Sequence, residues 1–344
     1  MSTESYLRAI PKVELHVHLE GSIQPETLLT LAQRNNAPLP FNTVEALREW
    51  FRFEDFPHFV DIYVAISNCL RSADDIELIT REFLIGQAAQ NIVHSEATYT
   101  ALTVNKLTGL DFETQLAAIN RARAWAHETL GVTMALITDI AREVTPEQGG
   151  ITAEWAVAGF GRGVDAFGLG GYEVGHPPTK HAASFDRTRA AGLPSIPHAG
   201  ETEGPASIWA AVRRLGARRI GHGVRCLEDP ALVDELRARQ IPLEVCPTSN
   251  VCLSVASSLD AHPLPKLIDA GLYVTLNSDD PPLFNTTLND EYVSCARVFG
   301  FDAAMMEHLS LNALQASLLP PAQRHVLERR FIGDFARLRA EHGV

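Results

Sequence analysis

Short apolar segments recur along this chain, and most of them end in polar or ionisable residues. Eight such segments can be counted, with helical stretches between them. The segments are Val13–Leu19, Ile92–Tyr99, Val132–Ile140, Val164–Leu169, Leu193–His198, Arg219–His222, Pro242–Cys246 and Leu272–Asn277. Brief apolar runs that alternate with helices are typical of parallel βα units. The pattern therefore predicts an α/β protein, a (β/α)8 barrel that forms a single domain over residues 1–344.

The stretches between these segments support helices. We predict helices over Pro205–Leu215, Pro230–Arg239 and Leu264–Ala270. The first two begin with proline, which suits the first turn of a helix because the N–H that proline lacks is unpaired there anyway.

Residues 24–90 form the longest connection, and they are predicted to be a mostly helical insertion after the first strand. This segment is rich in aromatic residues, namely Phe41, Trp50, Phe51, Phe53, Phe56, Phe59 and Tyr63. These side chains either belong to the core or, in part, wall the mouth of the barrel as a lid over a substrate.

The barrel prediction indicates where chemistry is expected, because active sites of such barrels lie at the carboxyl ends of the strands. His16 and His18 are two residues apart in the first strand, so their side chains point to the same face. Further polar groups follow three other strands, and they are His198 with Glu201, His222, and Asp279 with Asp280. Each group alone is a weak signal, but four groups at strand ends converge on one cavity.

This set of residues suits metal-assisted hydrolysis. His16, His18, His198 and Asp279 can hold a divalent ion and leave a position open for water. Such an ion lowers the pKa of water from about 15.7 toward about 7. His222 could orient the water or take its proton, and Glu201 could protonate the substrate or its leaving group.

Composition narrows the environment and the partners. The net charge is −13, which disfavours binding to the phosphate backbone of nucleic acids. The sequence contains no apolar run long enough to predict a membrane span, and its first residues lack the apolar core of a signal peptide. Five scattered cysteines fit a reducing compartment. We therefore expect a cytoplasmic protein whose partner is a small molecule.

Four arginines lie close together in the sequence and could form a basic patch. They are Arg213, Arg214, Arg218 and Arg219. Runs of like charge usually lie on a solvated helix face, and we interpret these four in that way.

Several motifs together resemble the adenosine deaminase family. They are Lys12–Gly21 (KVELHVHLEG), His198–Glu201 followed by Gly204-Pro205, Arg219–Gly223 (RIGHG) and Leu276–Pro281 (LNSDDP). They occur in the family's order and span nearly the whole chain.

The resemblance implies a (β/α)8 barrel that holds one zinc ion per chain and deaminates a purine nucleoside such as adenosine, releasing ammonia. His16, His18, His198 and Asp279 match the family's zinc ligands. Glu201 matches the residue that donates a proton to N1 of the purine, and His222 matches the residue beside the attacking water. The implied substrate contacts are Asp280 at N7, the backbone of Gly171 at N3, and Glu20 and His18.

Three positions depart from the adenosine-specific pattern. Glu20 stands where those enzymes have an aspartate that meets the 5′-hydroxyl, and Thr98 replaces the arginine of a Glu-x-Arg motif. The stretch Thr138–Glu143 looks more like a bacterial branch, some of whose members deaminate 6-amino-6-deoxyfutalosine, an adenine nucleoside with a benzoate group. Adenosine, that nucleoside, adenine and N6-substituted adenines all stay open. Arg52 or Arg71 could pair with a substrate carboxylate, unless they are ordinary surface arginines.

Two other classes of protein remain as alternatives. A related metal barrel could hydrolyse amides, lactones or phosphoesters, but two-metal versions typically need a bridging ligand such as a modified lysine. Lys12 and Lys106 do not end a predicted strand. A non-catalytic binding protein would usually have lost a ligand or Glu201, whereas every motif position is filled here. The sequence gives no indication of the oligomeric state.

Overall fold

Eight parallel strands form the centre of the molecule, as the apolar segments predict. The computed structural model describes residues 2–52 and 56–344. The strands are β1 (Lys12–His18), β2 (Ile92–Tyr99), β3 (Thr133–Ala141), β4 (Ala166–Gly170), β5 (Ser195–Ala199), β6 (Ile220–His222), β7 (Leu243–Val245) and β8 (Val274–Leu276). They pair in sequence order, and each predicted segment overlaps one strand. The (β/α)8 prediction is confirmed.

The barrel closes between its last and first strands, next to the residues of interest. Val17 forms a parallel bridge with Asp279. The N–H of His18 donates to the carbonyl of Asp279 at 2.9 Å, and the N–H of Asp279 donates to the carbonyl of His16 at 3.1 Å. The side-chain Oδ1 of Asn277 accepts from the N–H groups of both Leu15 and His16. This seam fixes the backbone of three predicted metal ligands.

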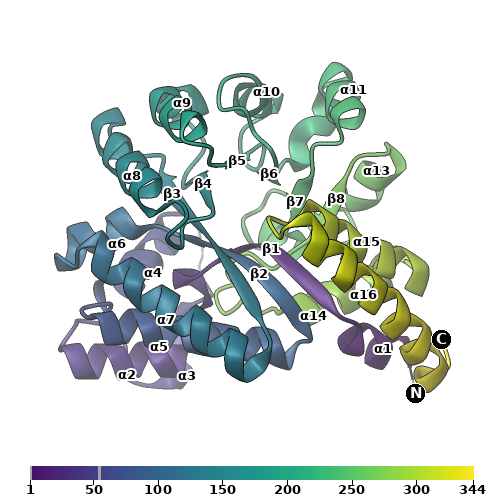
Figure 1. The fold of residues 1–344 in the computed structure, drawn as a ribbon, viewed down its shortest axis with the longest axis horizontal. Helices are drawn as coiled ribbons and strands as arrows, with labels where there is room; N and C mark the ends of the chain where they lie inside the picture. Colours follow the sequence, from purple (N-terminus) through teal and green to yellow (C-terminus); the bar gives the residue numbers. More distant parts are fainter. Residues whose placement is uncertain (1, 53–55) are drawn as a thin grey trace.

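Helices surround the strands (Figure 1). Those that follow β2 to β8 are α6 (Ala101–Thr108), α7 (Phe112–Leu130), α8 (Pro146–Gly159), α9 (Ala182–Ala190), α10 (Pro205–Arg213), α11 (Pro230–Arg239), α12 (Pro247–Cys252), α13 (Leu264–Asp269), α14 (Leu288–Phe299), α15 (Ala303–Ala316) and α16 (Pro321–His342). Two short 3₁₀ helices cover Pro178–His181 and Val224–Glu228. The first helix, α1 (Thr3–Ala9), lies beside α16, and Ser5 Oγ is 2.7 Å from His342 Nδ1.

The connection between β1 and β2 is helical, as predicted. It contains a 3₁₀ turn (Glu20–Ser22), α2 (Pro25–Asn35), α3 (Val44–Trp50), α4 (Phe56–Asn68) and α5 (Ala73–Ala89). Helix α5 packs against α7 and β2 and belongs to the ring of barrel helices. Helices α2 to α4 are therefore the insertion proper.

The aromatic residues of this insertion divide between the two predicted roles. Phe59 and Tyr63, on α4, line a cavity at the mouth of the barrel. Phe51 is buried in the core, whereas Phe41 is 44% exposed. Phe53 and the side chain of Phe56 lie outside the described residues. Helix α4 thus forms part of the wall of the cavity.

The arginine cluster is only partly a solvated face. Arg213, Arg214 and Arg218 are exposed, but Arg219 is fully buried, so the prediction was wrong for that residue. Arg219 directly precedes β6, and its guanidinium meets Glu96 on β2 at 2.6 Å and Glu244 on β7 at 2.5 Å. Two carboxylates thus compensate the cost of burying this charge. We call Glu96, Arg219 and Glu244 the inner ion network.

Within the described residues, no helix is both long and apolar enough to cross a bilayer.

Candidate metal centre and substrate cavity

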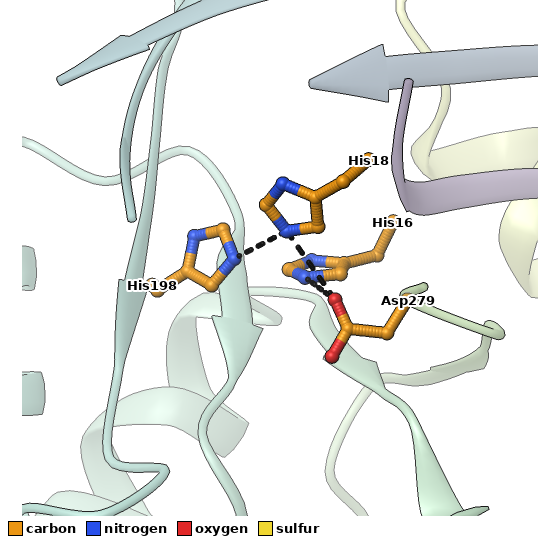
Figure 2. Close-up of side chains that lie close together, drawn as sticks. All are labelled: His16, His18, His198 and Asp279. Atoms are coloured by element: carbon orange, nitrogen blue, oxygen red, sulfur yellow. Dashed lines mark hydrogen bonds and ion pairs between the residues drawn. The ribbon is translucent and has the colours of Figure 1, made fainter. Parts of the chain in front are cut away.

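Four predicted ligands converge at the carboxyl end of the barrel. His16 and His18 come from β1, His198 comes from β5, and Asp279 follows β8. Figure 2 shows their side chains pointing toward one another. Asp279 Oδ1 lies 3.3 Å from Nε2 of both His16 and His18, and the Nε2 atoms of His18 and His198 are 3.2 Å apart. One ligand atom from each residue lies within 4.8 Å of all the others. We call these four residues the metal centre.

The chemistry of this group fits a divalent cation. His16 Nε2 is buried and makes no hydrogen bond. When each of these rings carries its proton on Nδ1, the facing Nε2 atoms of His18 and His198 can both present a lone pair to one cation. Three imidazoles and a carboxylate form a ligand set that zinc prefers. The four residues therefore fit such an ion.

A second carboxylate orients one of the ligands from behind. His16 Nδ1 is 2.9 Å from Glu244 Oε2, so its N–H points at Glu244 and Nε2 is left facing the metal centre. Glu244 in turn belongs to the inner ion network. On the other side, Ser249 Oγ donates to Asp279 Oδ2 at 2.6 Å. Glu244 was not predicted from the sequence, although an acidic residue inside an apolar strand is a signal that could have revealed it.

Glu201 has the environment of a proton donor. Burial raises its pKa to about 8, and the charges of Asp279 and Glu173 add to the effect. Its Oε1 is buried, makes no hydrogen bond and lies 3.6 Å from His222 Nε2. A carboxyl group that keeps its proton near neutral pH can act as a general acid.

A chain of hydrogen bonds fixes the tautomer of His222. The N–H of Leu264 donates to His262 Nδ1, so the neutral ring of His262 carries its proton on Nε2 and donates to Asn250 Oδ1 at 3.0 Å. The amide group of Asn250 then donates to His222 Nδ1 at 3.3 Å. Burial lowers the pKa of His222 to about 4, so its ring is neutral. The proton of His222 therefore sits on Nε2, which faces Glu201, and His222 acts as a hydrogen-bond donor.

The predicted substrate contacts lie around the same space. Asp280 lines the cavity, and its Oδ1 is buried without a hydrogen bond. Gly21 makes room for Asp280, because a Cβ atom at Gly21 would lie 1.6 Å from that oxygen. Gly171 also lines the cavity, and its φ of +86° favours glycine. Glu20 is fully buried, and its Oε1 accepts from the N–H of Thr100 at 2.9 Å.

The cavity has a volume of about 420 Å³. Its lining joins the metal centre and Glu201 to the apolar face of α4, and it also contains the carboxylates of Asp139 and Glu143. Among the described residues that line it, none is a lysine or an arginine. Arg52 pairs with Glu49, and Arg71 donates to Asn68, so both are surface arginines.

The chain is similar to known proteins over most of its length. Residues 11–332 match the family model described as adenosine deaminase. The chain belongs to the adenosine deaminase family. This chain is 40% identical over 317 residues to an aminodeoxyfutalosine deaminase of Streptomyces coelicolor. The match covers 92% of this chain and 82% of that protein.

Two solved structures share the fold of this chain. An adenine deaminase from Arthrobacter aurescens is similar with a TM-score of 0.90 and 34% identity, over 96% of this chain and 99% of that one. An amidohydrolase from Burkholderia ambifaria, solved with bound Zn, has a TM-score of 0.93 and 25% identity, over 100% of this chain and 96% of that one.

Proposed function

We propose that this chain hydrolytically removes the 6-amino group of an uncharged 6-aminopurine, with adenine as the first candidate. We further propose that one zinc ion per chain binds to His16, His18, His198 and Asp279. The observation that carries the proposal is that three of these four ligands, His18, His198 and Asp279, line one cavity together with Glu201, whose Oε1 is buried without a hydrogen bond. Membership of the adenosine deaminase family supports a deaminase in general.

The residues divide the work as follows. Zinc, when bound, would supply a Lewis acid that lowers the pKa of water. Glu201, protonated near neutral pH, donates its proton to N1 and so makes C6 electrophilic. The Nε2–H of His222 donates to the oxygen that approaches C6, which orients that oxygen rather than removing its proton. Asp280 and the backbone of Gly171 hold the ring at N7 and N3, the roles that the family resemblance implies.

The overall reaction balances with water alone. The oxygen of water forms the new bond to C6, and the bond from C6 to the amino nitrogen breaks. Glu201 gives its proton to N1, and one proton of water then reprotonates Glu201. The other proton of water leaves with the amino group as ammonia. The products are a 6-oxopurine and ammonia, and the enzyme returns to its starting protonation state.

The charge of the cavity supports the choice of substrate. Asp139, which lines the cavity, has one buried oxygen without a hydrogen bond, and so does Glu20, which is not among the described lining residues. Such oxygens accept hydrogen bonds from donors, for example the N9–H of adenine or the hydroxyls of a ribose. The benzoate of 6-amino-6-deoxyfutalosine would meet Asp139 and Glu143 with no lysine or arginine among the described lining residues. Burying like charges together is costly, which favours an uncharged purine.

Aminodeoxyfutalosine is the second candidate, and a specific finding favours it. The relative from Streptomyces coelicolor that carries this name in its description is 40% identical to this chain. Adenosine is the third candidate, because the hydroxyl groups of its ribose could donate hydrogen bonds to Glu20.

The test is to load the purified chain with zinc and to measure ammonia release from adenine, adenosine and 6-amino-6-deoxyfutalosine in parallel. We expect the highest kcat/KM with adenine. A preference for adenosine would mean that Glu20 and Asp139 accept ribose hydroxyls, and a preference for aminodeoxyfutalosine would contradict the charge argument. Release from none of these would contradict the proposed function. The variant Glu201→Gln, assayed alongside, controls for contaminating deaminases.

A further inference from the structure

Glu173 makes an unusual set of contacts for a side chain outside the substrate cavity. It lies in the loop after β4 and is 3% exposed. Its carboxylate accepts hydrogen bonds from four consecutive backbone N–H groups in the loop after β5. These donors are Gly200 (2.7 Å), Glu201 (3.0 Å), Thr202 (3.0 Å) and Glu203 (2.9 Å). Ser207 Oγ, from the first turn of α10, donates to the same carboxylate.

The loop held by Glu173 is the one that carries the acid Glu201. The chain leaves β5 through Gly200, at a φ of +72°, and enters α10 after Gly204. Gly204 is the N-cap of α10 and offers no side-chain acceptor. Amide groups that approach a helix N-terminus need acceptors, and a carboxylate there also interacts favourably with the helix dipole. Glu173 supplies this acceptor from a different strand.

Arg142 connects Glu173 to the rest of the site. Burial alone would raise the pKa of Glu173, but the charge of Arg142 and the hydrogen bonds that Glu173 accepts lower it, so the side chain stays ionised. Arg142 itself is fully buried and donates to the carbonyl of His198 at 2.6 Å and to that of Gly170 at 3.2 Å. Arg142, which directly follows β3, therefore joins the ends of β3, β4 and β5 through its hydrogen bonds, and from there its charge acts on Glu173.

We propose that Glu173 is a positioning residue that fixes Glu201 against N1 of the purine and ties it to the N3 contact at Gly171. Glu173 stands two residues after Gly171 in the sequence and holds the backbone of Glu201 directly. N1 and N3 flank a single carbon on one edge of the purine. The carboxylate of Glu173 thus sets the spacing between Glu201 and Gly171, the two residues that contact that edge. This inference rests on the proposed function, because it takes Glu201 as the acid.

The variant Glu173→Gln tests the role in catalysis. Glutamine keeps the size of the side chain but turns one acceptor into an NH₂ group that faces the backbone N–H donors. We expect kcat to fall on the order of 100-fold, as for a misplaced general acid, while KM changes by less than about threefold and zinc content is retained. The matched control is Glu203→Gln, which removes a carboxylate from the same loop but leaves its backbone N–H in place. It should keep kcat within about twofold.

A double variant separates positioning from a general loss of structure. If Glu173 acts through Glu201, then Glu173→Gln should cost little in an enzyme that already carries Glu201→Gln. An equal loss in both backgrounds, or loss of zinc, would overturn the proposal. Glu173→Asp keeps the charge and should recover part of kcat, and no recovery by this variant would also count against it.

Amide hydrogen exchange tests whether Glu173 holds the loop after β5, and it needs no assay of activity. In Glu173→Gln the amides of residues 200–203 should exchange faster than in the wild type, while Glu203→Gln should leave them protected. Unchanged protection in Glu173→Gln would overturn the proposal. If the wild type deaminates no 6-aminopurine, the proposed function fails, but the exchange result still decides whether Glu173 holds this loop.

Discussion

Two sets of buried ionisable groups in this barrel differ in how their hydrogen-bonding capacity is used. In the inner ion network, Arg219 meets a carboxylate on each side, at 2.6 Å and 2.5 Å, and Glu96 also accepts from the N–H of Leu318. At the metal centre and around it, His16 Nε2, Glu201 Oε1 and Asp280 Oδ1 are all buried without a hydrogen bond.

This difference separates charges that support the fold from groups that await a ligand. Native proteins rarely leave buried polar atoms unpaired, so a cluster of them in one cavity indicates binding or catalysis. The two sets meet at His16, whose Nδ1 faces Glu244 while its Nε2 faces the metal centre. The inner ion network thus orients a histidine of the metal centre.

The largest expected effect is on the metal centre. His16→Ala removes one of four ligands, so we expect the protein to lose zinc and all detectable deamination together. Zinc content by atomic absorption and ammonia release check this directly. His127→Ala, at an exposed position on α7, is the control and should keep both. Full zinc content in His16→Ala would remove His16 from the ligand set.

The next effect concerns the inner ion network. Arg219→Met removes the guanidinium charge that two buried carboxylates share, and we expect the free energy of unfolding to fall by about 3–5 kcal/mol. Denaturant unfolding of the zinc-free protein measures this without a contribution from bound metal. Arg214→Met removes an exposed arginine of the same cluster and should change it by less than about 0.5 kcal/mol. If both variants lowered the free energy of unfolding by the same small amount, the buried ion pairs would contribute little to stability.

A smaller effect is the dependence of turnover on pH. The proton donor must be protonated to act, and burial raises the pKa of Glu201 to about 8. Activity should therefore be retained below about pH 8 and fall roughly tenfold per pH unit above it. A profile of kcat/KM between pH 5 and 10 shows this limb. If activity already began to fall with rising pH below pH 6, the assignment of Glu201 as the acid would be contradicted.

The two sets of charges also differ in how far the sequence predicts them. The metal centre could be predicted because its residues stand at the ends of apolar runs, and the carboxyl ends of parallel strands meet at one edge of a barrel. Arg219 could not, because the other three arginines of its cluster are exposed and nothing in the run distinguishes it from them. Its burial depends on Glu244 and Glu96, which are 25 and 123 residues away.

Other parts of the site left no pattern in the sequence at all. Glu173 and Arg142 were missed because their partners are backbone N–H and C=O groups, which every residue has. The tautomer of His222 depends on Asn250 and His262, whose relation to it appears only once the chain is folded. The lid could be placed between the first two strands from its helical, aromatic composition, but the side chains that face the cavity could not be chosen.

The most direct test of the central claim is to measure zinc content and kcat of Glu201→Gln beside the wild type, with adenine as substrate. The account predicts the same zinc content in both proteins and a kcat that is lower by about 10²–10⁴-fold in the variant, because only the proton donor is lost. A variant that deaminates adenine as fast as the wild type would contradict the account, and so would a variant that has lost its zinc.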